Sequence, residues 1–193
     1  MSNIFLISDC HWGHEKTCTV FKRSDGSPLR PFANAEEMNE IMVERWNKVV
    51  KPTDKVYNLG DCVINRRYMD IHSRLNGDKR LVLGNHDIFE HTDYLKYYKR
   101  LHGSFKLDNL WLTHIPVHID SVPRWALANV HGHLHANEVM RKVDDTEILD
   151  SRYFNVSVEM IDFTPIALED LKKRIIEKQL KYPLENISNS AIL

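Results

Sequence analysis

Several features that would define a specialised class of protein are missing from this sequence. It has only three cysteines, Cys10, Cys18 and Cys62, and no C-x-x-C pair, so neither a disulfide framework nor a cysteine-rich zinc site is expected. Every apolar run is far shorter than the roughly 20 residues that cross a bilayer, and the first residues do not resemble a signal peptide. We therefore expect a cytoplasmic protein with reduced thiols and no membrane contact.

The chain also lacks net charge. It has 26 Lys and Arg against 27 Asp and Glu, which gives a formal charge of −1. A protein that holds nucleic acid along a broad basic surface needs an excess of Lys and Arg, so stable nucleic-acid binding is not expected. A small nucleotide needs only a local site and is not excluded. No heptad pattern or apolar surface strip indicates an oligomeric state.

The length of 193 residues and the 42% hydrophobic content predict a single domain spanning residues 1–193. Hydrophobic periodicity predicts strands at 3–8, 55–59, 80–83, 110–113 and 128–130, and helices at 35–51, 65–75, 94–101 and 167–179. Segments 138–142 and 153–158 are expected to pair as a β-hairpin or as adjacent strands across a polar turn at Asp144-Asp145. Trp46 and Trp111 are expected to lie in the core and not to form a base-stacking platform. Residues from about 181 to 193 form a polar tail that is expected to fray. The alternation of strands and helices predicts the α/β class.

Eleven histidines are an unusually large number for this length, and several of them stand in short polar clusters. The clusters are Asp9-Cys10-His11, Gly60-Asp61, Gly84-Asn85-His86-Asp87, Thr113-His114, and His131-Gly132-His133-Leu134-His135. Each cluster follows a predicted strand, where loops of an α/β sheet converge on a ligand. Carboxylate, amide and imidazole donors together suit divalent transition ions such as Mn, Fe, Co or Zn.

The order D-x-H, GD, GNHD, H and GHxH resembles that of the calcineurin-like metallophosphoesterase superfamily, and Asn155-Val156-Ser157-Val158 is similar to its compact bacterial and phage members. Each motif alone is weak, but five in this order are specific. The resemblance covers nearly the whole chain. It implies a single-domain, four-layer β-sandwich flanked by helices.

The resemblance also implies a site with two divalent metal ions, manganese first and Fe, Zn, Ni or Co as alternatives. Asp9, His11 and His135 would bind the first ion, and Asp61 would bridge the pair. The second ion would be bound by Asn85, His114 and His133. A hydroxide between the ions would attack the phosphorus of a phosphodiester or phosphomonoester, such as a nucleotide or a cyclic nucleotide.

Other residues near the motifs are expected to act on the substrate. The resemblance implies that His86 faces the substrate and donates a proton or stabilises charge. Asp87 either holds His86 as an imidazolium or supports the local turn. Arg30, Arg66 and Arg67 are weaker candidates for binding phosphate, because most arginines of this kind are solvated surface charges.

The remaining histidines are not expected to bind metal, and two alternative functions are considered. We interpret His14, His72, His91, His102 and His118 as surface or satisfied polar residues, with His118 and His131 as candidates to orient a neighbouring ligand. One alternative function is a nuclease that acts on short or single-stranded ends. The other is a non-catalytic metal-binding scaffold, against which the complete set of seven ligand residues argues.

Overall fold

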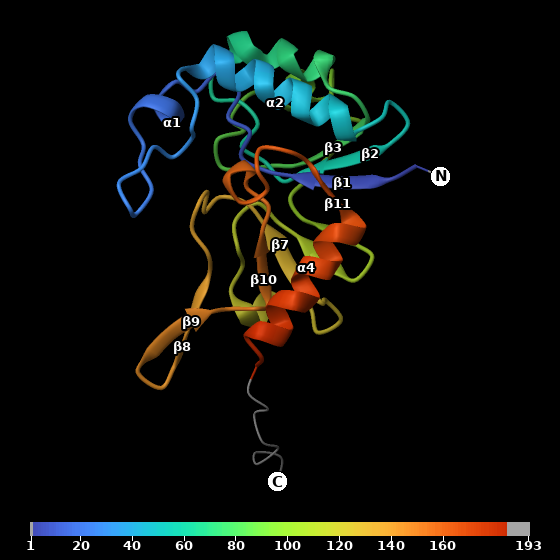
Figure 1. The fold of residues 1–193 in the computed structure, drawn as a ribbon. Helices are drawn as coiled ribbons and strands as arrows, with labels where there is room; N and C mark the ends of the chain where they lie inside the picture. Colours follow the sequence, from blue (N-terminus) through green and yellow to red (C-terminus); the bar gives the residue numbers. More distant parts are fainter. Residues whose placement is uncertain (1, 185–193) are drawn as a thin grey trace.

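The computed structural model describes residues 2–184, and a five-stranded sheet forms its upper half in Figure 1. The strands lie in the order β11-β1-β2-β3-β4. Their bounds are Ile4–Ile7 for β1, Lys55–Asn58 for β2, Asp78–Val82 for β3, Arg100–His102 for β4 and Ile166–Ala167 for β11. Strands β1 to β4 are parallel, and β11 closes one edge in the antiparallel direction.

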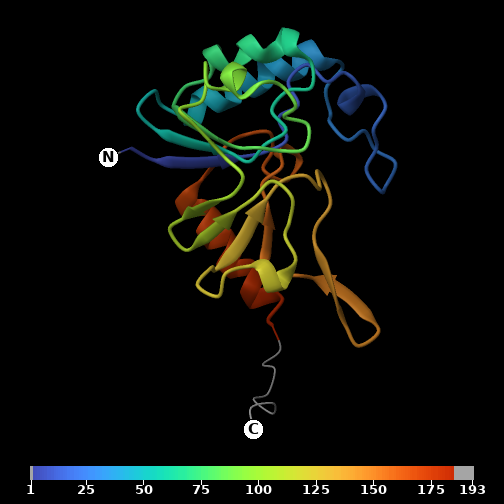
Figure 2. The same ribbon diagram turned by 180° about the vertical axis from the view of Figure 1, so that it is seen from behind.

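A four-stranded sheet forms the second half of the molecule, in the order β10-β7-β6-β5. Its strands are β5 (Phe105–Leu107), β6 (Leu110–Leu112), β7 (Ala128–His131) and β10 (Tyr153–Asn155). Strands β6, β7 and β10 are parallel, and β5 is the antiparallel edge. A separate hairpin of β8 (Met140–Val143) and β9 (Thr146–Leu149) projects away from both sheets (Figures 1 and 2).

Helices cover the two sheets. The longer ones are α2 (Ala35–Val49) and α4 (Leu168–Lys181), and the short ones are α1 (Lys16–Thr19), α3 (His91–Tyr94) and the 3₁₀ helices η1 (Arg66–Arg74), η2 (Ile119–Ser121) and η3 (Val158–Met160). Helix α2 lies over the first sheet, and α4 runs beside the second sheet and contacts β11 and β1 (Figure 1). Among residues 2–184, no helix is long and apolar enough to cross a bilayer.

The start of α2 follows from its sequence. The Asn34 side chain accepts a hydrogen bond of 2.8 Å from the Glu37 backbone N–H, which satisfies one free donor of the first turn. Met38, Met42 and Trp46 then recur on one face and are completely buried. This local signal and the burial agree, so the predicted helix forms where the periodicity places it.

The two sheets share one hydrophobic core. Leu6 and Leu81 from the first sheet and Leu110 and Val130 from the second belong to the same buried cluster. The structure confirms the α/β class. Because most strands in both sheets are parallel, the loops after β1, β2, β3, β6 and β7 lie at their carboxyl ends, where they meet between the sheets.

The prediction of a helix at 94–101 is wrong. Helix α3 ends at Tyr94, and β4 begins at Arg100 and extends the first sheet beside β3. Tyr94 and Tyr98 are both buried, so their spacing of four residues imitates a helical face although the chain between them turns. Long-range pairing with β3 therefore overrides the local pattern.

The pairing expected between 138–142 and 153–158 is also wrong. Strand β8 pairs with β9 across the turn at Asp144-Asp145, whereas β10 pairs in parallel with β7. A hairpin with a short polar turn forms from neighbouring residues, and β10 instead buries Tyr153 and Asn155 at the edge of the second sheet. Segment 65–75 is helical but in the 3₁₀ form. The predicted tail lies mostly at 185–193, outside the described residues.

Stability is predicted to depend on pH through His72, which is not a surface residue. It is 0% exposed, its Nδ1 lies 2.8 Å from the Met69 carbonyl oxygen, and its Nε2 has no partner among residues 2–184. Burial lowers the pKa of His72 from 6.5 to about 4. Between these values the unfolded chain binds more protons than the folded protein, so stability falls as the pH falls.

Replacement of this group tests the effect. From about pH 7 to about pH 5 the wild-type protein should lose about 2 kcal/mol more stability than His72→Phe in urea unfolding. The variant keeps a ring but cannot be protonated. The exposed His91 serves as the control, since His91→Phe should follow the wild-type curve. Parallel curves for wild type and His72→Phe would contradict the prediction.

Candidate metal centre

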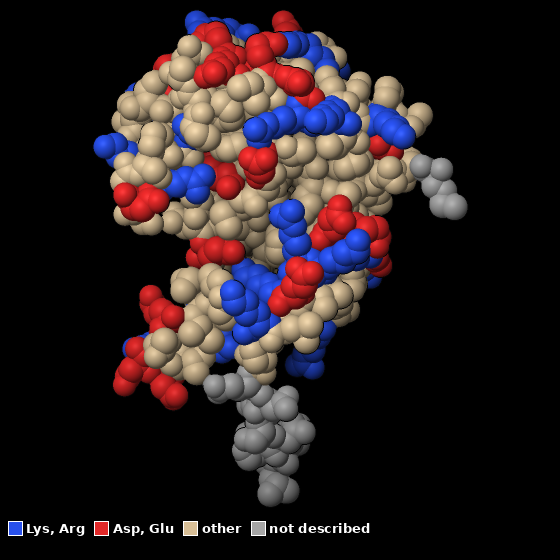
Figure 3. Space-filling view, viewed as in Figure 1, with Lys and Arg blue, Asp and Glu red and all other residues tan. Residues whose placement is uncertain are grey.

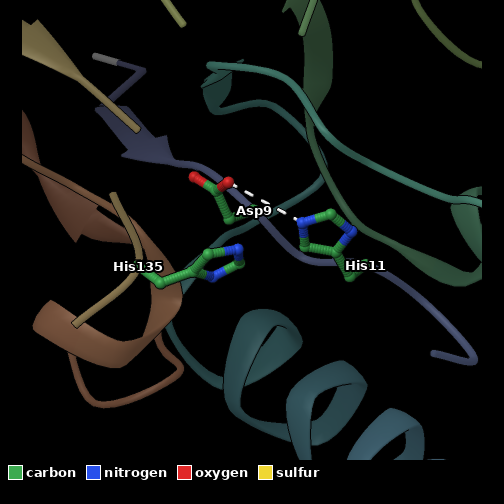
Figure 4. A group of neighbouring side chains, drawn as sticks. All are labelled: Asp9, His11 and His135. Carbon is green, nitrogen blue, oxygen red and sulfur yellow. Dashed lines mark ion pairs between the residues drawn. The ribbon is translucent and has the colours of Figure 1, made fainter. Parts of the chain in front are cut away.

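Two groups of potential metal ligands lie between the sheets. Asp9, His11 and His135 form the first group, and Asp61, His114 and His133 form the second. Within each group, one ligand atom of each residue lies within 4.8 Å of the others. Figure 4 shows the first group, in which the Asp9 carboxylate and the two imidazole rings face a common space.

The Asp61 carboxylate lies between the two groups. Its Oδ2 is 3.6 Å from Nε2 of His11, and its Oδ1 is 3.4 Å from Nε2 of His114. The two oxygens therefore face different groups, which is the arrangement required of a carboxylate that bridges two cations. Asn85 joins the second group, because its Oδ1 is 3.0 Å from Nε2 of His114. The structure thus brings the seven predicted ligand residues together.

Buried polar atoms without partners show that these residues fit a cation. Oδ1 of Asp9 and both ring nitrogens of His11 have no hydrogen-bond partner among the described residues. The other oxygen of Asp9, Oδ2, accepts from the His133 N–H at 2.8 Å and from the Ser157 hydroxyl at 2.9 Å. Buried groups of this kind are nearly always paired, so a divalent ion would satisfy the atoms that the protein leaves free.

Hydrogen bonds also fix the orientation of two of the histidines. Nδ1 of His114 lies 2.7 Å from the Leu59 carbonyl oxygen, and Nδ1 of His135 lies 3.1 Å from Oε1 of Glu159. Each Nδ1–H donates to an oxygen, so Nε2 is left with its lone pair toward the site. This is how outer partners prepare a histidine for a metal.

The backbone is strained at five of the candidate ligand residues. Asp9, His11, Asp61, His133 and His135 have φ values of 57°, 46°, 52°, 68° and 50°. Residues with a side chain seldom adopt this left-handed region, and each costs on the order of 1–3 kcal/mol. Such strain gathers at functional sites, and here it aims five side chains at one place.

Close packing requires glycine at motif positions, as Gly132 shows. A Cβ on Gly132 would lie 2.0 Å from Oγ of Ser8 and 2.3 Å from Oδ2 of Asp9. Only glycine allows the β7 loop to approach Asp9 this closely. Gly60 is required both by its φ of 100° and by packing, since a Cβ there would lie 2.6 Å from the Gly84 backbone nitrogen.

The charges of the site favour cations. Burial opposes ionisation of Asp9, but the neighbouring His11, His114 and His135 rings outweigh it and hold the pKa of this carboxyl well below its usual range. For Asp61, burial raises the pKa and His114 lowers it, and the net pKa is lowered. Burial lowers the pKa of His11, which keeps its ring neutral and able to bind a metal.

A family model described as calcineurin-like phosphoesterase matches residues 2–181. The chain belongs to the calcineurin-like phosphoesterase family. An uncharacterized protein of Methanocaldococcus jannaschii is 33% identical over 187 residues, which cover 92% of this chain and 93% of that protein. The Gene 66 protein of Mycobacterium phage L5 is 34% identical over 92 residues, or 45% of this chain and 41% of the phage protein.

A solved structure has a similar fold. The crystal structure of a protein of unknown function from Aquifex aeolicus has a TM-score of 0.62 and 22% identity, and the match covers 90% of this chain and all of that one. This likeness concerns the fold of the phosphoesterase family and assigns no substrate.

His86 and Asp87 of this phosphoesterase-family chain have different environments. The His86 N–H donates to Oδ1 of Asp61 at 2.8 Å, and its exposed ring lies 5.7 Å from that of His11. The Asp87 carboxylate accepts from the backbone N–H groups of Asp61, Cys62 and Gly84 at 2.8–3.0 Å. Asp87 therefore supports the turns after β2 and β3. These contacts agree with the expected role in the local turn and not with the role of holding His86 as an imidazolium.

The three candidate arginines have different environments. Arg30 is 0% exposed and donates to Glu159 at 2.8 Å and to the carbonyl oxygens of Asp9 and Cys10 at 2.6 and 2.8 Å. The expectation that it binds substrate is wrong, because its donors hold the Asp9 loop in place. Arg66 pairs with Asp93 and lies over Phe89, whereas Arg67 bonds the Tyr68 hydroxyl.

Sequence reasoning missed two residues at the site. Glu159 is buried and accepts hydrogen bonds from both Arg30 and His135. The residues it joins are 129 and 24 positions away, and no local pattern marks it. His14 lies half-buried at the rim, with its ring 5.7 Å from that of His11 and its Nδ1 unpaired among the described residues. Its position three residues after His11 was the available signal.

Glu159 is predicted to strengthen metal binding through His135. Glu159→Gln keeps the size of the side chain but removes the charge that holds the Nδ1–H of His135, so Mn²⁺ affinity should fall about 10- to 100-fold. Calorimetric titration of the metal-free protein measures the change. The exposed Glu147 on β9 gives a matched control, Glu147→Gln, which should bind like wild type. Equal affinities for both folded variants would refute the role of Glu159.

Proposed function

We propose that this protein hydrolyses phosphate esters with two divalent cations. Asp9, His11 and His135 would hold one cation. Asn85, His114 and His133 would hold the other, and Asp61 would contact both. The observation that carries the proposal is the position of Asp61, whose two carboxylate oxygens face different groups of ligands. When bound, such cations lower the pKa of water and neutralise charge on phosphoryl oxygens.

His86 acts on the substrate in this proposal. Its ring is exposed beside His11, and its backbone N–H is fixed by Asp61. A ring in this position donates a proton to the leaving oxygen or a hydrogen bond to the phosphoryl group. Asp87 acts indirectly, since its three backbone hydrogen bonds keep Asp61 and the loop that carries His86 in register.

The donor atoms of the site narrow the choice of cation, and the charges on the protein surface narrow the choice of substrate. Mixed oxygen and nitrogen donors suit Mn, Fe, Co, Ni or Zn, and we propose Mn²⁺ as the first ion to test. On the face drawn in Figure 3, Lys and Arg are interspersed with Asp and Glu. Interspersed charges give a long nucleic acid no broad basic surface on this face. We therefore propose a small phosphate ester, a phosphomonoester or a phosphodiester, as the substrate. The complete ligand set and the exposed His86 favour catalysis over a scaffold role.

Asp61 is predicted to be essential for the pair of cations. Wild-type protein with Mn²⁺ should bind near two ions per chain and hydrolyse bis-p-nitrophenyl phosphate or p-nitrophenyl phosphate. Asp61→Asn should lower metal affinity at one or both positions by more than about 100-fold, which exceeds the loss from an outer partner. Elemental mass spectrometry and the chromogenic assay measure both effects. Wild-type protein without turnover under any divalent ion would contradict the proposal.

His86 is predicted to affect turnover without affecting the metal content. His86→Ala should lower kcat by about 100- to 10,000-fold, the usual contribution of a positioned acid, while the metal count stays unchanged. The exposed His91, five positions along the chain, provides the control His91→Ala with wild-type kcat. A His86→Ala enzyme with undiminished kcat would remove His86 from the reaction.

A further inference from the structure

A groove of about 540 Å³ opens directly beside the second group of metal ligands. Asn85 and His114 line both the groove and the metal centre. The rest of its wall includes the apolar side chains of Leu83, Trp111, Ile115 and Val117. Its volume lies in the range of small-molecule sites, so a group attached to phosphorus at the metal centre has room beside it.

Trp111 does not lie in the core as expected. Its neighbours on β6, Leu110 and Leu112, are completely buried, and the alternation of the strand turns Trp111 to the opposite face, where it is partly exposed. Trp125 packs edge-to-face against it, with ring centroids 6.0 Å apart, and is itself 43% exposed. Lys106 lies 4.4 Å above the Trp125 ring. This backing holds the Trp111 ring as a firm wall of the groove.

The groove is neutral. None of the described residues that line it is Lys, Arg, Asp or Glu. A second phosphate group, or the backbone of a nucleic acid, would have no cation to meet there. Hydroxyl groups come from Ser104 and Ser121, which can exchange hydrogen bonds with a polar ring edge. The chemistry therefore suits a flat, uncharged ring with polar edges.

We propose that this groove binds the base of a nucleoside phosphate whose phosphorus lies at the metal centre. The inference rests on the proposed function and adds the substrate class to it. Trp111 provides an aromatic face against which a base stacks, and Ile115 and Val117 exclude water from the ring. The loop after β6 links the two halves of the site, since His114 is a metal ligand and Ile115 follows it directly.

Binding without metal tests the groove separately from hydrolysis. Calorimetry should detect adenosine binding to the metal-free protein and no comparable binding of ribose. Ile115→Glu places a charge against the base, where it loses water without gaining a partner. Adenosine binding should weaken by about tenfold or more, the size of one base–aromatic contact. Ile176→Glu on α4 is a matched control, because Ile176 and Ile115 are 49% and 48% exposed. It should bind adenosine like wild type.

A second variant tests the groove if Ile115→Glu does not fold. Trp111→Leu keeps an apolar side chain but removes the ring, and should also lose about tenfold in adenosine affinity. With Mn²⁺ present, kcat/KM for adenosine 5′-monophosphate should exceed that for ribose 5-phosphate, and both groove variants should reduce this ratio by about the same factor.

The outcomes separate the two proposals. Adenosine binding that falls in Ile115→Glu and Trp111→Leu, in a protein that hydrolyses nothing, supports the groove and rejects the proposed function. Three results would reject the proposed base-binding groove. One is hydrolysis with equal kcat/KM for the two phosphates, and another is adenosine binding that is no stronger than ribose binding. The third is equal adenosine binding by Ile115→Glu and Ile176→Glu.

Discussion

The position of the Asp61 carboxylate is the constraint on which the site depends. Its backbone N–H donates to Asp87, its carbonyl oxygen accepts from the His11 N–H at 3.0 Å, and its Oδ1 accepts from the His86 N–H. Gly84 approaches so closely that a Cβ there would lie 2.2 Å from Oδ1 of Asp61. The loops after β1, β2 and β3 are thus joined through one residue, whose oxygens face the two groups of ligands.

The shared core of the two sheets maintains this arrangement, although the strained backbone and the unpaired buried atoms of the site cost stability. Five candidate ligand residues have left-handed backbone, and buried atoms of Asp9 and His11 lack hydrogen bonds among the described residues. Strain and unsatisfied polar groups persist only where the surrounding structure determines them. Arg30 and Glu159 add a buried ion pair that ties the Asp9 loop to His135. The free atoms are those that a divalent ion would satisfy.

The neighbourhood of the metal centre is asymmetric. His11, His14 and His86 gather beside the first group of ligands, with ring separations of 5.7 Å from His11. The apolar groove with Trp111 lies beside the second group. In the function that we propose, the charged centre of a phosphate ester lies beside the histidines and its organic remainder lies in the groove. The groove is lined by residues on β6 and the loop after it, together with residues that follow β3.

Strands β1, β2, β3, β6 and β7 and helices α2 and α4 were predictable from the sequence, because each depends on neighbouring residues. The candidate ligand residues stand in short motifs that the family resemblance identifies. An apolar run, a cap at Asn34 or a motif such as His133-Leu134-His135 carries its signal within a few positions. Strand β4, the pairing of β10 with β7, and the buried roles of Arg30 and Glu159 came only from the tertiary structure. These features depend on contacts between residues far apart in the chain, for which no local pattern exists. The sequence by itself therefore determined which side chains offer ligands, and the packing of the two sheets decided which backbone groups, counter-charges and apolar walls surround them.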